Sequence, residues 1–140
     1  MPDGERAVRP IALRVVPGPL AQPVGARVVT ALAARADLPL DRVLDALLLT
    51  DTVLGSVLAA IGTDALDVTF APSPGRLAIA LVGLPAGTGE RLLNVGPAVQ
   101  GISVLARLCD ETRVTVAADG SEHLDLVVLA ARPDAAAPAT

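Results

Sequence analysis

The chain has 140 residues, the length of one domain, because two independent cores would each lie near the lower size limit for folding alone. Hydrophobic residues make up 52% of it, which excludes a disordered protein. Phe70 is the only aromatic residue and the net charge is −4, so the chain lacks the rings and basic surface typical of nucleic-acid binding. We expect one domain with an aliphatic core and no direct nucleic-acid partner.

Several features of the composition indicate where the protein works. No apolar run is long enough for a membrane span, and the first residues lack the pattern of a signal peptide. Cys109 has no second cysteine to pair with, so we interpret it as a buried small hydrophobe in a reducing compartment. All 11 basic residues are arginine, a bias typical of GC-rich genes. We expect a cytoplasmic, bacterial protein that is folded over 11–131, with flexible tails at 1–10 and 132–140.

The first half of the chain predicts one strand and two helices. Alternating apolar residues predict a strand over 11–16. The next segment has apolar residues at every fourth position and tolerates Pro23 in its first turn, which predicts a helix closed by Asp37-Leu38-Pro39. A second helix of about 22 residues ends at Gly62. The expected inward positions of the two helices are Leu20, Val24, Val28 and Leu32, then Val43, Leu47, Leu54, Val57, Leu58 and Ile61.

The second half predicts two hairpins separated by a loop and a helix. Strands over 66–70 and 77–82 are joined by a turn at 72–75, and strands over 113–116 and 123–130 by Asp119-Gly120. Residues 84–101 are rich in glycine and proline without periodicity, which predicts a long lid-like loop beside a functional site. A third helix is expected to start at Pro97 or Gly101. Its inward residues are Ile102, Leu105 and Leu108.

The order of these elements is strand, helix, helix, strand, strand, loop, helix, strand, strand. Helices gathered against an antiparallel sheet form a two-layer α+β sandwich. We therefore predict a mostly antiparallel, five-stranded sheet with three helices on one face.

Few residues are candidates for chemistry. Asp51 could act as a general base, but without a metal ion and a bound phosphate it has nothing to activate, and we interpret it as an acid on the solvated side of a helix. His123, beside Glu122 at a hairpin end, is interpreted as a solvated turn residue, because no Ser-His-Asp triad or metal cluster can be built around it. The segments Gly87-Thr88-Gly89 and Gly96-Pro97 lack the lysine and Ser/Thr of a phosphate-binding loop. We expect no catalytic residue and no metal ion.

The element order resembles the histidine-kinase-like ATPase fold, and the anti-sigma regulatory factors are the members closest in size. On the second helix, Asp51, Gly55 and Ala59 stand where these factors carry Glu, Asn and often His. The family's Asp-x-Gly-x-Gly meets residues 83–87, of which Gly87 alone matches. Its Gly-x-Gly-Leu motif meets 99–102, with only half of the motif kept, and a later Asp meets Asp110.

The resemblance implies a degenerate nucleotide site. In the family the Asn ligates the magnesium ion, and Gly55 offers no oxygen for that purpose. The family's first Asp accepts the adenine amino group, which Gly83 cannot do, and Pro85 removes a backbone donor. We expect a nucleotide-free relative without a cofactor. The remnants of its pocket are Asp51, Gly55, Gly83, Gly87 and Gly101.

The resemblance also implies a regulatory role through protein binding. The expected partner is a sigma factor or an anti-anti-sigma protein of the STAS type, bound through Arg27, Arg35 and Arg107 on the first and third helices. Two alternatives remain: an ATP-dependent serine kinase of the anti-sigma kind, and an inert subunit of a homodimer. The second rests on a small apolar patch expected on the sheet face opposite the core. Its residues are Ala78, Ala80 and Val82.

Overall fold

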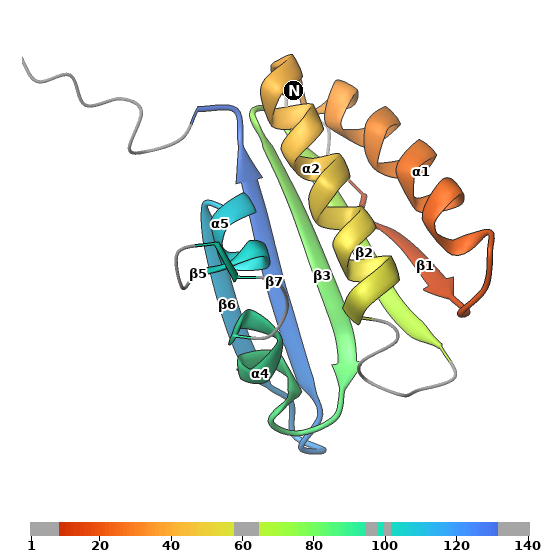
Figure 1. Ribbon diagram of the computed structural model, residues 1–140, viewed down its shortest axis with the longest axis vertical. Coiled ribbons are helices and arrows are strands. Elements are labelled where there is room, and N and C mark those ends of the chain that lie inside the picture. Colours follow the sequence, from red (N-terminus) through yellow and green to blue (C-terminus); the bar gives the residue numbers. More distant parts are fainter. Residues whose placement is uncertain (1–8, 58–64, 95–97, 100–101, 132–140) are drawn as a thin grey trace, which may run out of the picture.

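A computed structural model describes residues 9–57, 65–94, 98–99 and 102–131 of the chain (Figure 1). One sheet has the strand order β1-β2-β3-β7-β6, and every neighbouring pair in it is antiparallel. The strands of this sheet are β1 (Ile11–Val15), β2 (Leu66–Ser73), β3 (Arg76–Leu84), β6 (Glu111–Val116) and β7 (Glu122–Leu129). The short strands β4 (Ala98–Val99) and β5 (Ile102–Ser103) pair separately. The α-helices of the described residues are α1 (Ala21–Arg35), α2 (Leu40–Thr52), α4 (Thr88–Asn94) and α5 (Val104–Leu108).

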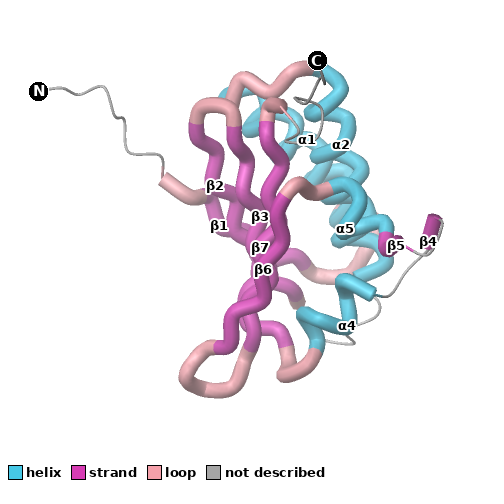
Figure 2. Tube along the Cα trace, turned by 90° about the vertical axis from the view of Figure 1, so that its left-hand side faces the viewer, coloured by secondary structure: helices cyan, strands magenta, loops and turns pink. Residues whose placement is uncertain are grey.

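The helices form a second layer beside the sheet. Figure 2 shows all four of them on the same side of the strands. Helix α1 packs on β2, whereas α2 and α4 pack on β7. The predicted α+β class and the five-stranded antiparallel sheet are therefore confirmed, with four α-helices among the described residues instead of three.

The core lies between these two layers and is built by the period-two pattern of the strands. Phe70 of β2 pairs with Ile79 of β3, which pairs with Leu126 of β7, so one row of inward side chains crosses three strands. Their alternate neighbours face away from the helices, as a pleated strand requires. The buried inward residues of these strands are Leu66, Val68, Phe70, Leu77, Ile79, Leu81, Leu124, Leu126 and Val128.

The hairpin between β2 and β3 is tighter than the sequence pattern predicts. Pairing continues through Pro72 to Ser73, which lies opposite Arg76. Only Pro74 and Gly75 remain for the turn, and Gly75 has φ +74°. Proline followed by a residue with positive φ is the combination that a type II turn requires.

The inward face of α1 differs from the prediction. Leu20 is 71% exposed and Val24 49% exposed, whereas the buried face runs through Gly25. Two effects explain the difference. A spacing of four overshoots the helical period of 3.6, so such a row drifts around the helix. A Cβ atom on Gly25 would lie 2.2 Å from Cδ1 of Leu54, so glycine lets α1 approach this leucine closely. The buried residues of α1 are Gly25, Val29, Leu32 and Ala33.

The predicted end of α1 is confirmed. Asp37 has φ +58°, and the backbone N–H of Leu38 donates to the carbonyl oxygen of Ala33 at 3.1 Å. A left-handed residue with this hydrogen bond is the Schellman motif that closes many helices. Helix α2 then starts at Leu40 and continues as one π-helical turn, η1 (Val53–Val57). The predicted end at Gly62, with Leu58 and Ile61, lies outside the described residues.

The predicted lid-like loop over 84–101 is wrong for most of its described part. Helix α4 occupies Thr88–Asn94 and buries Leu92, and Ala98–Val99 is a strand. Seven residues make only two helical turns, too short a segment for a periodic apolar signal. The predicted third helix begins later, at Val104, because Ile102 belongs to β5. Gly96, Pro97 and Gly101 lie outside the described residues.

The predicted turn at Asp119-Gly120, in the last hairpin, is confirmed. Gly120 has φ +88°, and Oδ1 of Asp119 accepts hydrogen bonds from the backbone N–H and the hydroxyl of Ser121. These hydrogen bonds hold the pKa of Asp119 below its ordinary value. Strand β7 buries Leu124, Leu126 and Val128, whereas β6 is an edge strand on which Val114 is half-buried and Val116 exposed.

Candidate functional site

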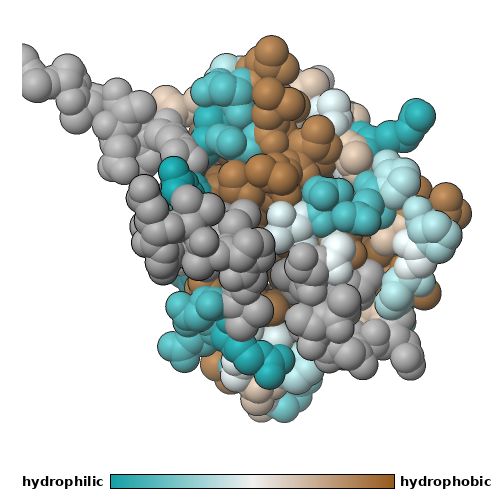
Figure 3. Space-filling model, viewed as in Figure 1, coloured by the Kyte–Doolittle hydropathy of each residue, from teal (hydrophilic) through white to brown (hydrophobic). Residues whose placement is uncertain are grey.

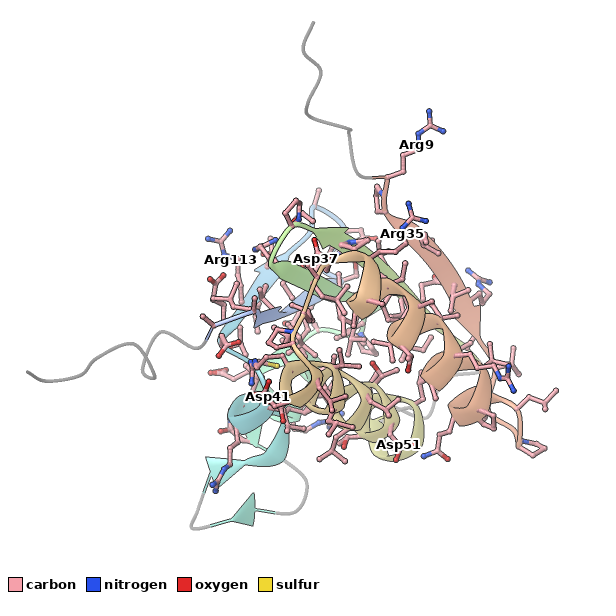
Figure 4. All side chains as sticks on the ribbon, turned by 90° about the horizontal axis from the view of Figure 1, so that it is seen from above. Arg9, Arg35, Asp37, Asp41, Asp51 and Arg113 are labelled. Atoms are coloured by element: carbon pink, nitrogen blue, oxygen red, sulfur yellow. The ribbon has the colours of Figure 1, made fainter. Side chains whose placement is uncertain are left out.

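Asp51 lies in the last turn of α2 and Gly55 in the π-helical turn η1 that follows, and both lie beside Gln22 of α1. The side-chain Nε2 of Gln22, on α1, donates to Oδ1 of Asp51 at 2.9 Å and to its backbone carbonyl at 3.3 Å. A Cβ atom on Gly55 would lie 2.8 Å from that same nitrogen. Gln22, which the sequence analysis did not single out, therefore fills the space beside Gly55. Figure 4 shows Asp51 near the C-terminal end of α2.

Gly83 and Gly87 lie at the end of β3 and before α4. Both have positive φ, +74° for Gly83 and +81° for Gly87, and both are exposed. Gly83 lies in an irregular part of the β3–β7 pairing, between Leu81 and Leu84. No hydrogen bond or ion pair among the described residues joins these two glycines to Asp51 or Gly55.

The carboxylate of Glu122 accepts hydrogen bonds from the glycine-rich segment at the start of α4. Its Oε2 accepts from the backbone N–H of Gly87 at 2.7 Å, and its Oε1 from that of Gly89 at 2.8 Å. Glu122 is only 8% exposed. Backbone N–H groups at the start of a helix are the donors that bind phosphates in other proteins. Here an acidic side chain of the same chain already accepts from two of them.

The space around Glu122 admits only glycine at position 89. A Cβ atom there would lie 2.9 Å from Cγ1 of Val114 and 3.0 Å from Oε1 of Glu122. Sequence reasoning treated Glu122 only as a neighbour of His123. The alternation of the strand could have revealed the burial of Glu122. Glu122 lies two residues before the buried Leu124, so both side chains face inward.

A second buried charge cluster surrounds Arg42, which is 3% exposed. Its guanidinium group forms ion pairs with Asp45 and Asp110, and its Nε donates to the carbonyl oxygen of Leu129 at 2.9 Å. Asp110 also accepts from the backbone N–H of Leu129 at 2.8 Å. The cluster joins α2 to the end of β7 and to the connection between α5 and β6. The sequence analysis did not single out Arg42, although Ala46 and Leu49 share its helix face.

Cys109 lies beside this cluster and is buried, as predicted. Burial is the main cause that raises the pKa of its thiol to about 12, and the negative charge of Asp110 adds to it against the opposing effect of Arg42. The thiolate is the nucleophilic form of cysteine. Cys109 is therefore unsuited to nucleophilic chemistry at neutral pH.

The three arginines predicted to bind a partner are all exposed. Arg27 and Arg35 lie on α1, and neither forms an ion pair within the described part of the chain. Arg107 lies on α5, and Figure 1 shows α1 and α5 on opposite sides of α2. The three side chains are therefore divided between two surfaces.

The outer side of α2 carries a row of exposed leucines that the sequence analysis did not single out. Leu40 is 74% exposed, Leu44 55% and Leu48 51%. A spacing of four places these side chains along one side of the helix. We call these three residues the leucine row. Figure 3 shows the hydrophobic surface gathered over this part of the helical layer.

The opposite face of the sheet carries the predicted patch of small residues. Ala78, Ala80 and Val82 are half-buried and alternate with the buried residues of β3. The exposed ion pair between Arg14 and Asp67, with 2.9 Å between Nε and Oδ1, lies at the side of this patch. None of the described helices covers this face in Figure 2.

Comparison with known proteins identifies no relative: no protein-family model and no curated protein matches the chain. Within the described residues, no group of histidine, cysteine, aspartate and glutamate side chains is arranged to hold a metal ion. No described helix combines the length and the apolar character needed to cross a bilayer.

Proposed function

We propose that this protein is a regulatory protein-binding module that holds no nucleotide, with the histidine-kinase-like ATPase fold of the anti-sigma factors. The element order supports the relationship to that fold. The main support for a protein that binds no nucleotide is the pair of hydrogen bonds that the backbone N–H groups of Gly87 and Gly89 donate to Glu122. A phosphate at this place would meet a buried carboxylate of its own sign, and the charge repulsion opposes its binding.

The state of α2 supports the same conclusion. In the family, the residue matched by Gly55 supplies an oxygen to the magnesium ion, and Gly55 has no side chain. The terminal amide of Gln22 lies beside Gly55, so a larger residue at this position would require that amide to move. Asp51, matched with the family's acidic residue, already accepts a hydrogen bond from Gln22.

We expect that millimolar ATP or ADP with magnesium leaves the melting temperature unchanged. A ligand stabilises the folded state by RT ln(1 + [L]/Kd), which vanishes when its concentration is far below Kd. The chain has no tryptophan or tyrosine, so unfolding is followed by far-ultraviolet circular dichroism. An increase of several degrees in the melting temperature that saturates at micromolar ATP would contradict the proposal. It would favour the alternative function, an ATP-dependent serine kinase.

The proposed partner is a sigma factor or a STAS-type anti-anti-sigma protein in the cytoplasm. Arg27 and Arg35 are exposed on α1, and arginine is favoured where an interface binds carboxylates. The helical layer also offers the leucine row as apolar contact area. Both features suit a protein surface better than a small ligand, which requires an enclosed pocket.

The double variant Arg27→Glu with Arg35→Glu is expected to fold normally and to lose its partner. Reversing a charge that is paired across an interface costs about 2–5 kcal/mol, or about 30-fold or more in affinity. The measurement is co-purification from the source cell, followed by identification of the captured protein. Arg113→Glu is the matched control, since Arg113 is exposed on β6 at a distance from α1 (Figure 4).

Two outcomes would contradict this prediction. Equal capture by the double variant and the wild type would move the interface away from α1. Captures that contain neither a sigma factor nor a STAS-type protein would refute the regulatory function itself.

A further inference from the structure

We propose that the outer surface of α1 and α2 is a dimer interface, on which the leucine row of each copy is covered by a second copy of this chain. The leucine row is the first observation. Three leucines, each more than half exposed, follow one another along one helix. Single exposed leucines are common on monomers, whereas a continuous apolar surface marks a contact with another molecule.

The second observation is the separation of charge between the two helices. The charged residues exposed on α1 are Arg27 and Arg35, and the helix contains no acidic residue. The charged residues exposed on α2 are Asp41 and Asp51. The one arginine of α2, Arg42, points into the core. The basic helix α1 therefore lies directly beside the acidic helix α2, with Arg35 on the side of α1 away from α2 (Figure 4).

This arrangement is complementary to itself. Helices α1 and α2 run antiparallel, side by side, with the leucine row on α2 (Figure 1). A two-fold axis parallel to both helices, between the two copies, would place α2 of each copy on α1 of the other. Each acidic helix then faces a basic helix, and the leucine rows lie near the middle of four packed helices. A partner whose charge has one sign would match only one of the two helices.

The size of this surface sets the expected strength of the dimer. Helix α1 has 15 residues and is therefore about 22 Å long, and two adjacent helices are about 20 Å wide together. Such a face offers about 440 Å² per copy, roughly half of the ~800 Å² that a standard interface buries per partner, so it belongs to the weak and transient class. We expect a dimer that dissociates at micromolar concentrations.

The test is sedimentation equilibrium with the purified chain, recorded by interference optics because tryptophan and tyrosine are absent. The wild type is expected to pass from monomer to dimer as its concentration rises from about 1 to about 200 μM, a range that brackets the micromolar dissociation constants of weak dimers. Leu44→Glu places a carboxylate in the middle of the leucine row and is expected to remain a monomer throughout. Leu44 is 55% exposed, so its circular dichroism and melting temperature are expected to stay unchanged.

Val116→Glu is the matched control, because Val116 is 64% exposed on β6 and receives the same charge. It is expected to form the dimer as the wild type does. Arg35→Glu is expected to weaken the dimer, because the two-fold axis places Arg35 of one copy at the level of Asp41 of the other. Adding Asp41→Arg is expected to restore part of the affinity by exchanging the charges of the two helices.

Two results would overturn the inference. The first is a wild-type chain that remains a monomer at the highest concentration. The second is a dimer that survives in Leu44→Glu and is lost in Ala80→Glu, because the interface would then be the sheet face. Because the dimer covers the leucine row and α1, the second copy and the proposed partner exclude each other at this surface. The sedimentation experiments use the chain alone, so a failed search for a sigma factor or STAS-type partner leaves their outcome unaffected.

Discussion

Replacing Arg42 by methionine is expected to lower the free energy of unfolding by about 3–5 kcal/mol. Arg42 is 3% exposed, and the side chain of Asp110, with which it forms an ion pair, is 4% exposed. Without the guanidinium group, the carboxylate of Asp110 stays buried without its cation, and the carbonyl oxygen of Leu129 loses a donor. A domain of this size is stable by only about 5–15 kcal/mol, so the change is a large fraction of the total.

Urea unfolding followed by circular dichroism measures this effect. Arg113→Met is the matched control, since Arg113 is exposed on the edge strand β6 and its loss should change stability by less than about 0.5 kcal/mol. Adding Asp110→Leu to Arg42→Met should recover part of the loss, because it removes the uncompensated buried charge. A loss below about 1 kcal/mol for Arg42→Met would show that water reaches Asp110 and that the cluster does not hold α2 to β7.

Replacing Glu122 by alanine is expected to lower the free energy of unfolding by about 3 kcal/mol, since hydrogen bonds to a charged group contribute about 1.5–3 kcal/mol each. Two backbone N–H groups, those of Gly87 and Gly89, lose their acceptor in this variant. The N–H of Gly89 is buried and has no access to water in exchange. Helix α4 has only seven residues and depends on such contacts, because an isolated helix of this length is unstable.

Urea unfolding measures the loss, and hydrogen exchange at the amides of Gly87 and Gly89 locates it. Glu122→Gln keeps one acceptor oxygen and should lose less. Glu111→Ala is the control on the exposed edge strand, where the carboxylate lies 3.8 Å from Arg76 and contributes little. Unchanged exchange at both glycines in Glu122→Ala would show that the carboxylate does not hold the start of α4.

The strands and their hairpins follow from the sequence by itself. Leu66, Val68 and Phe70 alternate with Asp67 and Thr69, and this alternation decides which face enters the core whatever packs upon it. The turns are equally local, because Pro74-Gly75 and Asp119-Gly120 supply the backbone conformations that tight turns need. The five-stranded antiparallel sheet was predictable for this reason.

The orientation of helix α1 depended on its neighbour in space. Its leucines and valines cover more than one side, so periodicity alone allowed several inward faces. The close approach of Leu54 to Gly25 selected one of them. Helix α4 is held by Glu122, 33 residues beyond Gly89 in the chain, and no pattern within the glycine-rich segment contains that information.

The sequence by itself thus determined the strands, the turns and the aliphatic character of the core, because these depend on residues close together in the chain. Tertiary structure alone decided that Glu122 accepts from Gly87 and Gly89, that Arg42 is buried between two aspartates, and that the leucine row faces outward. Each of these depends on groups that folding brings together from distant elements. A buried charge is stable only where such partners surround it, and a helix face is exposed only where no other element covers it.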